Sequence, residues 1–496
     1  MFNFLKRSKR RDTNVAKSSE SKSKQRPQAA SKARTGEKRE GTLRRDSGRA
    51  DICSFYPYPT FRVGHRKALE LIEENWKNFD VALIVAPMGS GKTAIRRAIA
   101  YWAKDVAMTV PNNNLLMQEI EEFPQTHKIF RKAFYHCPIC YEMDLADVKT
   151  RKEPTLTVPH SYIAHRLGRE VLIVDEGHKL VEINTDLQAT HVWQKDINYP
   201  ITTYNRADLE AHLRKVYNGE KKLNKLLNKL QTNDYMIKRE VRGFRGKGQD
   251  RISIIPLYPE THPTLIKNTK KIILLSATLS DQDVYDLGIG RNRRILKIEI
   301  PSPIPAERRP LVLDFIASLH RYNLKEKAPA IARRIRSLRK TYAGKGKGLV
   351  HVTYELANYL RPYLESDPNY IFHTKLTAKK KLDEWMKSPA SEGKVFIASG
   401  AEEGLNLDGS DYYWQAIAKI SWASLADTAV RKKKEENEAW YYWQALKKVI
   451  QAYGRISRGP TDMGVTHIWD RSFIRLIDNA EKFGLIPDFF KEVLPK

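Results

Sequence analysis

A short apolar run that ends in a glycine-rich turn and a Lys-Thr pair, VALIVAPMGSGKT at Val81–Thr93, constrains the fold more than any other segment. The apolar residues predict a buried parallel strand, and Gly89, Ser90 and Gly91 permit the tight turn that brings backbone N–H groups against a triphosphate. A helix that begins near Lys92 would point its positively polarised N-terminus at that anion. This order of strand, turn and helix predicts an α/β fold with a phosphate-binding loop.

The end of this loop and a second apolar run supply the residues of an ATPase site. We expect Lys92 to reach the β- and γ-phosphates, and the Thr93 hydroxyl to ligate the Mg²⁺ that bridges them. The second run, EVLIVDEGH at Glu170–His178, ends in an acidic pair. Asp175 is predicted to hold Mg²⁺, directly or through water, and Glu176 to orient and deprotonate the attacking water. The alternative is an ordinary strand end with a solvated acidic pair, which the upstream loop disfavours.

Further segments follow in the order that a two-lobed motor requires. KIILLSATLS at Lys271–Ser280 reads as a strand followed by small hydroxyl residues. Ser276 and Thr278 could link the nucleotide site to a nucleic-acid face, although such a segment can also be a plain turn. FIASGAEEGLNL, at residues 396–407, likewise follows a strand and offers further contacts to the nucleotide site. These candidate contacts are Glu403, Gly404 and Asn406.

The segment QAYGRISR at Gln451–Arg458 is predicted to lie on a helix that presents Gln451, Arg455 and Arg458 at near-helical spacing. Arg458 is the candidate arginine finger and Arg455 its partner. A guanidinium that enters from a second lobe would neutralise the charge that develops on the γ-phosphate. Two arginines on a helix can equally form a solvated face, so this interpretation depends on the other motifs.

Taken together, these motifs resemble those of the XPD/DinG branch of superfamily 2 helicases. The similarity includes FRVGH at Phe61–His65, where the family has Arg-x-Gly-Gln, and covers most of residues 55–490. It implies that Arg62 and His65 contact the nucleotide. The chain departs from the family at His65, where a Gln would read adenine, and at Asn406, where an Asp is usual. The first departure weakens the expectation of strict ATP preference, and the second weakens that of strong coupling between lobes.

The resemblance implies an ATP-dependent helicase or translocase that uses ATP and Mg²⁺ and acts on single-stranded and tailed duplex DNA as a monomer. The family alone implies 5′-to-3′ polarity. An RNA helicase or a translocase that does not separate strands is the alternative within enzymes. The alternative from another class is a basic nucleic-acid-binding protein with a degenerate ATPase, which Lys92, Asp175, Glu176 and Arg458 argue against.

Cysteines mark the third departure from the family, because its iron–sulfur members hold the cluster with four thiolates. The corresponding interval has only Cys137 and Cys140, and Cys53 is the one other cysteine in the chain. A zinc site that adds His136 and His160 is chemically allowed, but a single CxxC is a weak signal. We therefore favour two reduced thiols in a compact turn over zinc or an iron–sulfur cluster, and a reducing compartment follows.

Charge and composition favour a polyanionic partner. The formal charge is +29, from 87 Lys and Arg against 58 Asp and Glu. Residues 1–50 have little to bury and are predicted to form a disordered basic arm, which either holds DNA or only aids solubility or targeting. No apolar run approaches the length of a membrane span, and the N-terminus lacks a signal-peptide core. An intracellular location in cytoplasm, nucleoid or nucleus is expected, and a viral source stays open.

The positions of strands and motifs predict two RecA-like parallel-sheet lobes in tandem. The first is expected at residues 51–300 and the second at 301–496, with a hinge near Pro301–Pro310, where four prolines interrupt the pattern. The first lobe is expected to carry a small insertion at about residues 119–165 and a mostly helical one at about 183–265. In the family, the second of these is the position of the arch insertion, which is short here.

The larger insertion has a Leu- and Lys-rich centre at Ala207–Leu230, with helical spacing, and a basic stretch at Lys238–Arg251. We expect it to form a small helical clamp over a single strand. Arg242, Phe244 and Arg245 would supply charge and a stacking ring. A basic hairpin that is merely solvated is the alternative interpretation.

Overall fold

The computed structural model describes most of the chain beyond residue 49. The described residues are 50–111, 113–122, 127–130, 135, 137–150, 155–160, 169–193, 206–216, 224, 227–228, 235–244, 247–257, 269–287, 289, 293–374, 376–399, 407, 411–457, 459 and 461–495. Several predictions lie outside these residues. They concern the basic arm up to Arg49, and the individual residues His136, Arg245, Glu403, Gly404, Asn406 and Arg458.

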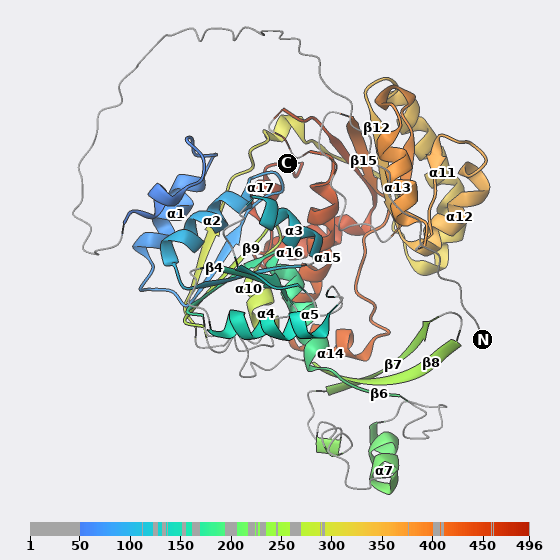
Figure 1. Ribbon diagram of the computed structural model, residues 1–496. Coiled ribbons are helices and arrows are strands. Elements are labelled where there is room, and N and C mark those ends of the chain that lie inside the picture. Colours follow the sequence, from blue (N-terminus) through green and yellow to red (C-terminus); the bar gives the residue numbers. More distant parts are fainter. Residues whose placement is uncertain are drawn as a thin grey trace, which may run out of the picture. The chain divides into compact units, whose positions relative to one another are not determined.

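The first lobe is built on a seven-stranded sheet in the order β10-β1-β9-β5-β2-β4-β3. Figure 1 labels β4 and β9 of this sheet. Its strand pairs are all parallel. The strands are β1 (Val81–Val85), β2 (Val106–Val110), β3 (His127–Lys128), β4 (Thr155–Pro159), β5 (Val171–Asp175), β9 (Lys271–Ser276) and β10 (Ile295–Glu299). The helical elements of this part are η1 (Ile52–Phe55), α1 (His65–Glu74), α2 (Lys92–Ala103), α3 (Asn113–Glu122), α4 (Pro138–Thr150), η4 (Gly177–Lys179), α5 (Leu180–Gln188) and α10 (Asp281–Asp286).

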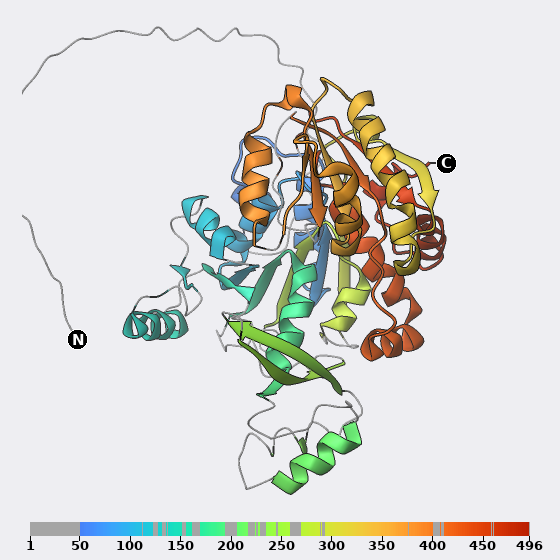
Figure 2. The ribbon, with the colours of Figure 1, turned by 90° about the vertical axis from the view of Figure 1, so that its right-hand side faces the viewer.

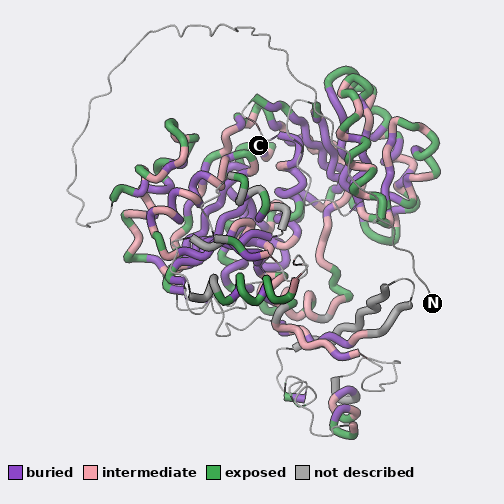
Figure 3. Tube along the Cα trace, viewed as in Figure 1, coloured by how far each residue is buried: buried purple, intermediate pink, exposed green. Residues whose placement is uncertain are grey.

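Alternate residues of the central strands enter separate cores on the two faces of this sheet. Ala82 and Ile84 of β1 pack with α1 and α2, whereas Val81, Leu83 and Val85 belong to the core on the opposite face. All five residues of β1 are buried, as expected for a parallel strand that is covered on both sides (Figure 3). Uninterrupted apolar runs therefore mark the strands of this lobe correctly.

The second lobe contains a six-stranded sheet in the order β11-β16-β15-β12-β14-β13, and its strand pairs are again parallel. Helices α11 and α12 cover one face through a shared core (Figure 2). The strands are β11 (Leu311–Ala317), β12 (Lys347–Val352), β13 (Tyr370–Ile371), β14 (Val395–Ser399), β15 (Tyr412–Ile417) and β16 (Val465–Asp470). The helical elements are η5 (Ala306–Arg308), η6 (Arg321–Asn323), α11 (Leu324–Thr341), α12 (Tyr354–Leu364), α13 (Ala378–Lys387), η7 (Ala390–Glu392), α14 (Thr428–Glu436), α15 (Glu438–Tyr453), α16 (Ser472–Lys482) and α17 (Asp488–Lys491).

These two sheets confirm the predicted fold class of two parallel-sheet α/β lobes in tandem. The segment between the sheets, from Ile300 to Pro310, contains the predicted hinge prolines. Arg309 in this segment is 4% exposed, and its Nη1 donates to the carbonyl oxygen of Phe489 at 2.6 Å. Its other guanidinium nitrogens bond the carbonyl of Ile304 and the carboxylate of Glu492. Arg309 therefore ties the segment between the sheets to the C-terminal segment.

The prediction of a mostly helical insertion at 183–265 is wrong for its described residues. Besides the end of α5 and the helical residues 224, 227 and 228, its described elements include helix α7 (Arg206–Val216) and two ten-residue strands, β7 (Tyr235–Phe244) and β8 (Lys247–Pro256). The strands form an antiparallel sheet with β6 (Thr190–Trp193) in the order β6-β8-β7.

Alternation explains why this segment forms strands. Ile252 and Ile254 of β8 are buried in a small core with Val192 of β6 and Leu209 and Leu213 of α7, whereas the intervening residue of β8 is polar. The basic stretch therefore lies in a hairpin of β7 and β8.

The predicted small insertion at 119–165 also needs correction. Strand β4 lies inside it and pairs with β2 from Val106↔Thr155 to Val110↔Pro159, so this part belongs to the sheet. Because TLTVP is short and half polar, its strand character is weak in the sequence. Within the described part of the chain, no helix is long and apolar enough to cross a membrane.

Candidate functional site

The predicted phosphate-binding loop runs from the end of β1 to the start of α2. Gly89 and Gly91 have φ angles of 75° and 87°, a region that L side chains rarely adopt. A Cβ atom at Gly91 would lie only 2.6 Å from Nη1 of Arg62. At the other end, the backbone N–H of Ala86 donates to the carbonyl oxygen of Ser276 on β9 at 2.9 Å. The turn therefore requires both glycines, and pairing with β9 fixes where it begins.

The residues of this loop fit a bound phosphate and its metal ion. The side chain of Ser90 is 3% exposed, and its hydroxyl has no hydrogen-bond partner within the residues that the structure describes. A buried hydroxyl of this kind suits a loop in which a ligand supplies the missing partner. Thr93 lies in the first turn of α2, and Asp175 is the last residue of β5. Both strands that lead to these candidate Mg²⁺ ligands, β1 and β5, neighbour β9.

Glu176 is the centre of the site's electrostatics. Its Oε1 lies 3.7 Å from Nζ of Lys92, and its backbone adopts a left-handed φ of 48°. Burial acts to raise the pKa of Glu176, but the positive charge of Lys92 and a hydrogen bond from Ser276, with smaller contributions from the charges of Lys179 and Arg455, outweigh it. The pKa therefore lies below its ordinary value, and the carboxylate is ionised at neutral pH.

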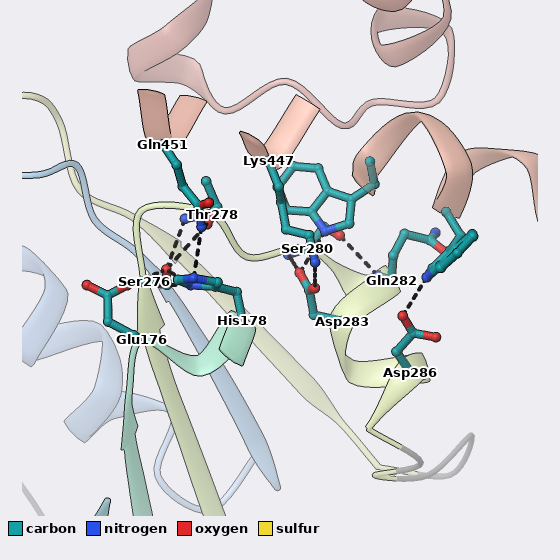
Figure 4. Close-up of polar contacts among 12 residues, drawn as sticks. Glu176, His178, Ser276, Thr278, Ser280, Gln282, Asp283, Asp286, Lys447 and Gln451 are labelled. Atoms are coloured by element: carbon teal, nitrogen blue, oxygen red, sulfur yellow. Dashed lines mark hydrogen bonds and ion pairs between the residues drawn. The ribbon is translucent and has the colours of Figure 1, made fainter. Parts of the chain in front are cut away.

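Four polar side chains connect Glu176 to the second lobe (Figure 4). The hydroxyl of Ser276 donates to Oε2 of Glu176 at 3.1 Å, and Nδ1 of His178 lies 2.7 Å from that hydroxyl. The side-chain amide of Gln451 lies 2.8 Å from Nε2 of His178 and 3.3 Å from Oγ1 of Thr278. Ser276 has a single hydroxyl proton and gives it to Glu176, so His178 must donate from Nδ1 and accept from Gln451 at Nε2.

This arrangement forms a directed path of hydrogen bonds from α15 to the carboxylate of Glu176. The structure brings together the predicted coupling residues Ser276 and Thr278 and the predicted contact Gln451. His178, which links them, was missed. Its signal was present in the sequence, because it is the last residue of the DEGH segment.

Asp175 has a partner that the sequence did not suggest. Nη1 of Arg96, on α2, lies 2.9 Å from Oδ2 of Asp175, and Nη2 of the same guanidinium contacts the carboxylate of Glu119 on α3. Arg96 is 2% exposed. An arginine on an amphipathic helix is usually solvated, so no local pattern in KTAIRRAIA distinguishes this one from Arg97.

The nucleotide contacts implied by the family resemblance lie against the loop. His65 is fully buried, with Nε2 2.7 Å from the carbonyl oxygen of Ser90 and Nδ1 2.8 Å from the hydroxyl of Tyr56. Burial lowers the pKa of His65 to about 4, so the ring is neutral at pH 7. A carbonyl can only accept, so Nε2 carries the proton and Nδ1 accepts from Tyr56. Arg62 donates to the carbonyl oxygen of Gly89 at 3.2 Å.

Both ring nitrogens of His65 are thus used within the protein, and the side chain supports the loop. In the family, a Gln at this position reads the base. His65 has no ring nitrogen free for such a contact. Arg62 is exposed beside the same loop.

The prediction that Gln451, Arg455 and Arg458 share one helix is wrong for Arg455. Helix α15 ends at Tyr453, and Arg455 follows in a turn. Gly454 ends the helix where the chain passes the phosphate-binding loop, because a Cβ atom there would lie 2.9 Å from Sδ of Met88. Arg455 is 5% exposed, and its charge helps to lower the pKa of Glu176. Arg455 therefore acts electrostatically on the first lobe, and Arg458 lies outside the described residues.

Among the residues that the structure describes, the cysteines do not gather with other metal ligands. Cys53, Cys137 and Cys140 are free thiols, and the backbone N–H of Cys140 donates to Sγ of Cys137 at 3.5 Å. Cys140 is exposed, whereas His160 is fully buried with Nδ1 2.9 Å from the hydroxyl of Thr109. Across the described ranges, no group of three or more His, Cys, Asp or Glu side chains could hold a metal ion.

Comparison with known proteins supports the two-lobed fold and, in the second lobe, a sequence similarity to helicases. Residues 350–481 match a family model described as a helicase C-terminal domain. A solved XPD helicase superposes with a TM-score of 0.57 at 13% identity, over 86% of this chain and 99% of that one. Xpd4 of S. tokodaii gives 0.55 at 14% identity, over 86% and 98%. No protein of curated function matches the sequence.

At such low identities, the structural likeness carries the fold alone, and the family model adds sequence evidence for the second lobe. The predicted resemblance is confirmed at that level: the chain has the two-lobed fold of XPD-like superfamily 2 helicases, and its residues 350–481 are similar to a helicase C-terminal domain.

Proposed function

We propose that this protein is an ATP-dependent helicase or translocase that moves along nucleic acid. The observation that carries the proposal is the path Gln451–His178–Ser276–Glu176, because it joins a helix of the second lobe to the carboxylate beside the phosphate-binding loop. Such a path lets an event at the nucleotide change the relation between lobes, which is what a motor requires. A degenerate ATPase has no need of this arrangement.

Lys92 and Glu176 are placed to exchange partners when the nucleotide binds. The lysine lies 3.7 Å from the carboxylate. Phosphate oxygens would attract Lys92, and the carboxylate would then lose the positive neighbour that lowers its pKa the most. Its proton affinity would rise as water is positioned for attack. Thr93 and Asp175 would hold Mg²⁺, which supplies positive charge at the phosphates.

The positive charge needed to complete hydrolysis would come from the second lobe. Arg458 remains the arginine-finger candidate and Arg455 its partner, and Arg455 already acts on Glu176. Arg458→Ala should slow hydrolysis by orders of magnitude with little change in nucleotide affinity, since a finger acts mainly in the transition state. If affinity and turnover fall together, Arg458 is a ground-state ligand and Arg455 becomes the better candidate. Glu403, Gly404 and Asn406 remain candidate nucleotide contacts.

DNA is the proposed track, and 5′-to-3′ movement is proposed on the family resemblance alone. The net charge of +29 favours a polyanion but does not distinguish DNA from RNA. The decisive measurement compares ATP turnover with single-stranded DNA, duplex DNA and RNA, followed by unwinding of duplexes with a 5′ or a 3′ tail. Stimulation by RNA alone would replace the DNA proposal. Turnover that no nucleic acid stimulates would refute the motor.

Two substitutions test the site assignment. Lys92→Ala should abolish stimulated hydrolysis and leave nucleic-acid binding largely intact, because the lysine meets phosphates of the nucleotide and not of the strand. Glu176→Gln should retain nucleotide binding through Asp175 and Lys92 but accumulate the bound, unhydrolysed nucleotide. Rapid turnover in either variant would place the chemistry on other residues.

A further inference from the structure

One side of helix α15 carries polar and aromatic side chains that bond to the first lobe along its length. Trp440, Trp443, Lys447 and Gln451 are spaced by three, four and four residues, which places them on one helix face. Trp443 and Lys447 bond Asp283 of α10, and Gln451 bonds His178 and Thr278 (Figure 4). We call Asp283, Trp443 and Lys447 the α15 anchor.

Asp283 is the acceptor of this anchor and is fully buried. Its Oδ1 accepts from Nζ of Lys447 at 2.9 Å, and its Oδ2 accepts from the indole N–H of Trp443 at 2.8 Å. The backbone N–H of Ser280 donates to the same Oδ2 at 3.0 Å. A carboxylate with three donors, one of them cationic, has its buried charge satisfied within the protein.

Apolar contacts hold the same two elements together. Trp443, Leu446 and Val449 of α15 share one hydrophobic core with Val284 and Leu287 of the α10 region. An interface between lobes that is buried and apolar resists separation, unlike the small polar interfaces across which domains usually move. The α15 anchor therefore fixes this part of the second lobe against the first.

The anchor lies one helical turn before the residues that reach the nucleotide site. Gln451 follows Lys447 by four residues and begins the path to Glu176. Gly454 then passes Met88 of the phosphate-binding loop, and Arg455 acts on Glu176. A shift of the helix at Lys447 would therefore move Gln451 within the same helix. It would also displace the start of the segment that carries Gly454 and Arg455 directly after the helix end at Tyr453.

We propose that Asp283, Trp443 and Lys447 are positioning residues, which set α15 so that Gln451 and Arg455 meet Glu176 in the geometry for hydrolysis. This inference rests on the proposed ATPase activity. None of the three belongs to the phosphate-binding loop or to the acidic pair Asp175–Glu176. Any effect of these residues on turnover therefore passes through α15.

Lys447→Met tests the anchor, with Lys448→Met as its matched control. The two lysines are neighbours on α15, but Lys447 is buried against Asp283 and Lys448 is exposed. In Lys447→Met, turnover by folded protein should fall on the order of 10²-fold, the effect of a misplacement of about 1 Å. Affinity for a fluorescent ATP analogue should change less than about twofold, because no nucleotide contact is removed. Trp443→Phe, which keeps an aromatic ring but loses the donor, should show the same split to a smaller degree.

A second readout reports the position of α15 without hydrolysis. A Cβ atom at Gly454 would lie 3.5 Å from Cβ of Met88, which suits a disulfide. Met88→Cys with Gly454→Cys should therefore cross-link on mild oxidation, as mapped by mass spectrometry. The cross-link should form at least about tenfold more slowly when Lys447→Met is added, but not when Lys448→Met is added, since the anchor no longer holds the helix end in place.

Outcomes of the two readouts are distinguishable. Wild-type turnover together with unchanged cross-linking in Lys447→Met overturns the positioning role. The positioning role is also overturned if nucleotide affinity, turnover and the folded fraction of Lys447→Met all fall in proportion. In that case the residue only supports the fold. If the wild-type protein fails to hydrolyse ATP but cross-linking still depends on Lys447, the proposed function fails and the positioning of α15 stands.

Discussion

Replacing Arg96 should show how strongly Asp175 of the acidic pair depends on a residue outside that pair. Arg96 is 2% exposed and contacts two carboxylates, those of Asp175 and Glu119. The side chains of Asp175 and Glu119 are 16% and 9% exposed, so water replaces little of the lost guanidinium. In Arg96→Leu, both acids would be left in a poorly solvated place without the guanidinium between them.

Removal of one member of a buried ion pair costs about 3–5 kcal/mol, because the remaining charge is uncompensated. For a unit of this lobe's size, each kcal/mol lowers the thermal midpoint by about 2–4 °C, so a fall of ~6–20 °C is expected. Glu119→Leu added to Arg96→Leu should recover part of the loss, since only one carboxylate then remains. Mg²⁺ with nucleotide should also recover part, if Asp175 lies near the metal ion.

The assay is the midpoint of the first thermal transition, measured with and without Mg²⁺–nucleotide, because a two-lobed chain need not unfold in one step. Arg97→Leu is the matched control: Arg97 is the next residue on α2, is half-buried and lies over the ring of Tyr101 at 5.9 Å. A midpoint for Arg96→Leu equal to that of the control would refute the reasoning. A double variant less stable than Arg96→Leu would show that the two carboxylates do not repel each other.

Three other predictions concern pH and nucleic acid. The pKa of His65 falls from 6.5 to about 4 on folding, so its contribution of about 3 kcal/mol is full above pH 6.5 and is lost as pH falls towards 4. His65→Gln should flatten the decline of the thermal midpoint across that window, and an unchanged decline would exclude His65. Replacing Arg242, Phe244 and Arg245 together with Ala should weaken single-strand binding, and loss of the stacking ring should account for about 1–3 kcal/mol of the binding free energy. Basal hydrolysis should be unchanged. An unchanged affinity for single strands would show that the hairpin does not bind them. A chain beginning at Ala50 should keep hydrolysis but bind DNA with a shallower salt dependence, and an equal slope would exclude the basic arm from the contact.

Local signals were sufficient for the strands and the loop. The runs at 81–85, 171–175 and 271–276 are apolar throughout or nearly so, because parallel strands covered on both faces leave no exposed side. The glycine pattern of the phosphate-binding loop is equally local, because each glycine answers a backbone requirement at its own position.

Contacts between residues that are far apart in the sequence could not be predicted from local patterns. Arg96 and Arg97 are equivalent in the sequence, and only the fold places one of them against Glu119 and Asp175. His178 and Ser276 are separated by 98 residues, so their hydrogen bond has no sequence signature. In the hairpin, the alternation of β8 becomes evident only once Ile252 and Ile254 are seen to be buried.

Asp283 has one role at the start of its own helix and a second role between the lobes. Ser280 and Asp283 form a capping box at the start of α10, in which the carboxylate accepts the backbone N–H of Ser280. Within α10 alone, that bond would account for the residue. The fold buries the same carboxylate and adds donors from Trp443 and Lys447 of the second lobe. Asp283→Asn can retain the bond to Ser280 but removes the charge that pairs with Lys447. A variant that still begins α10 yet loosens α15 would therefore separate the local role of this carboxylate from its role between the lobes.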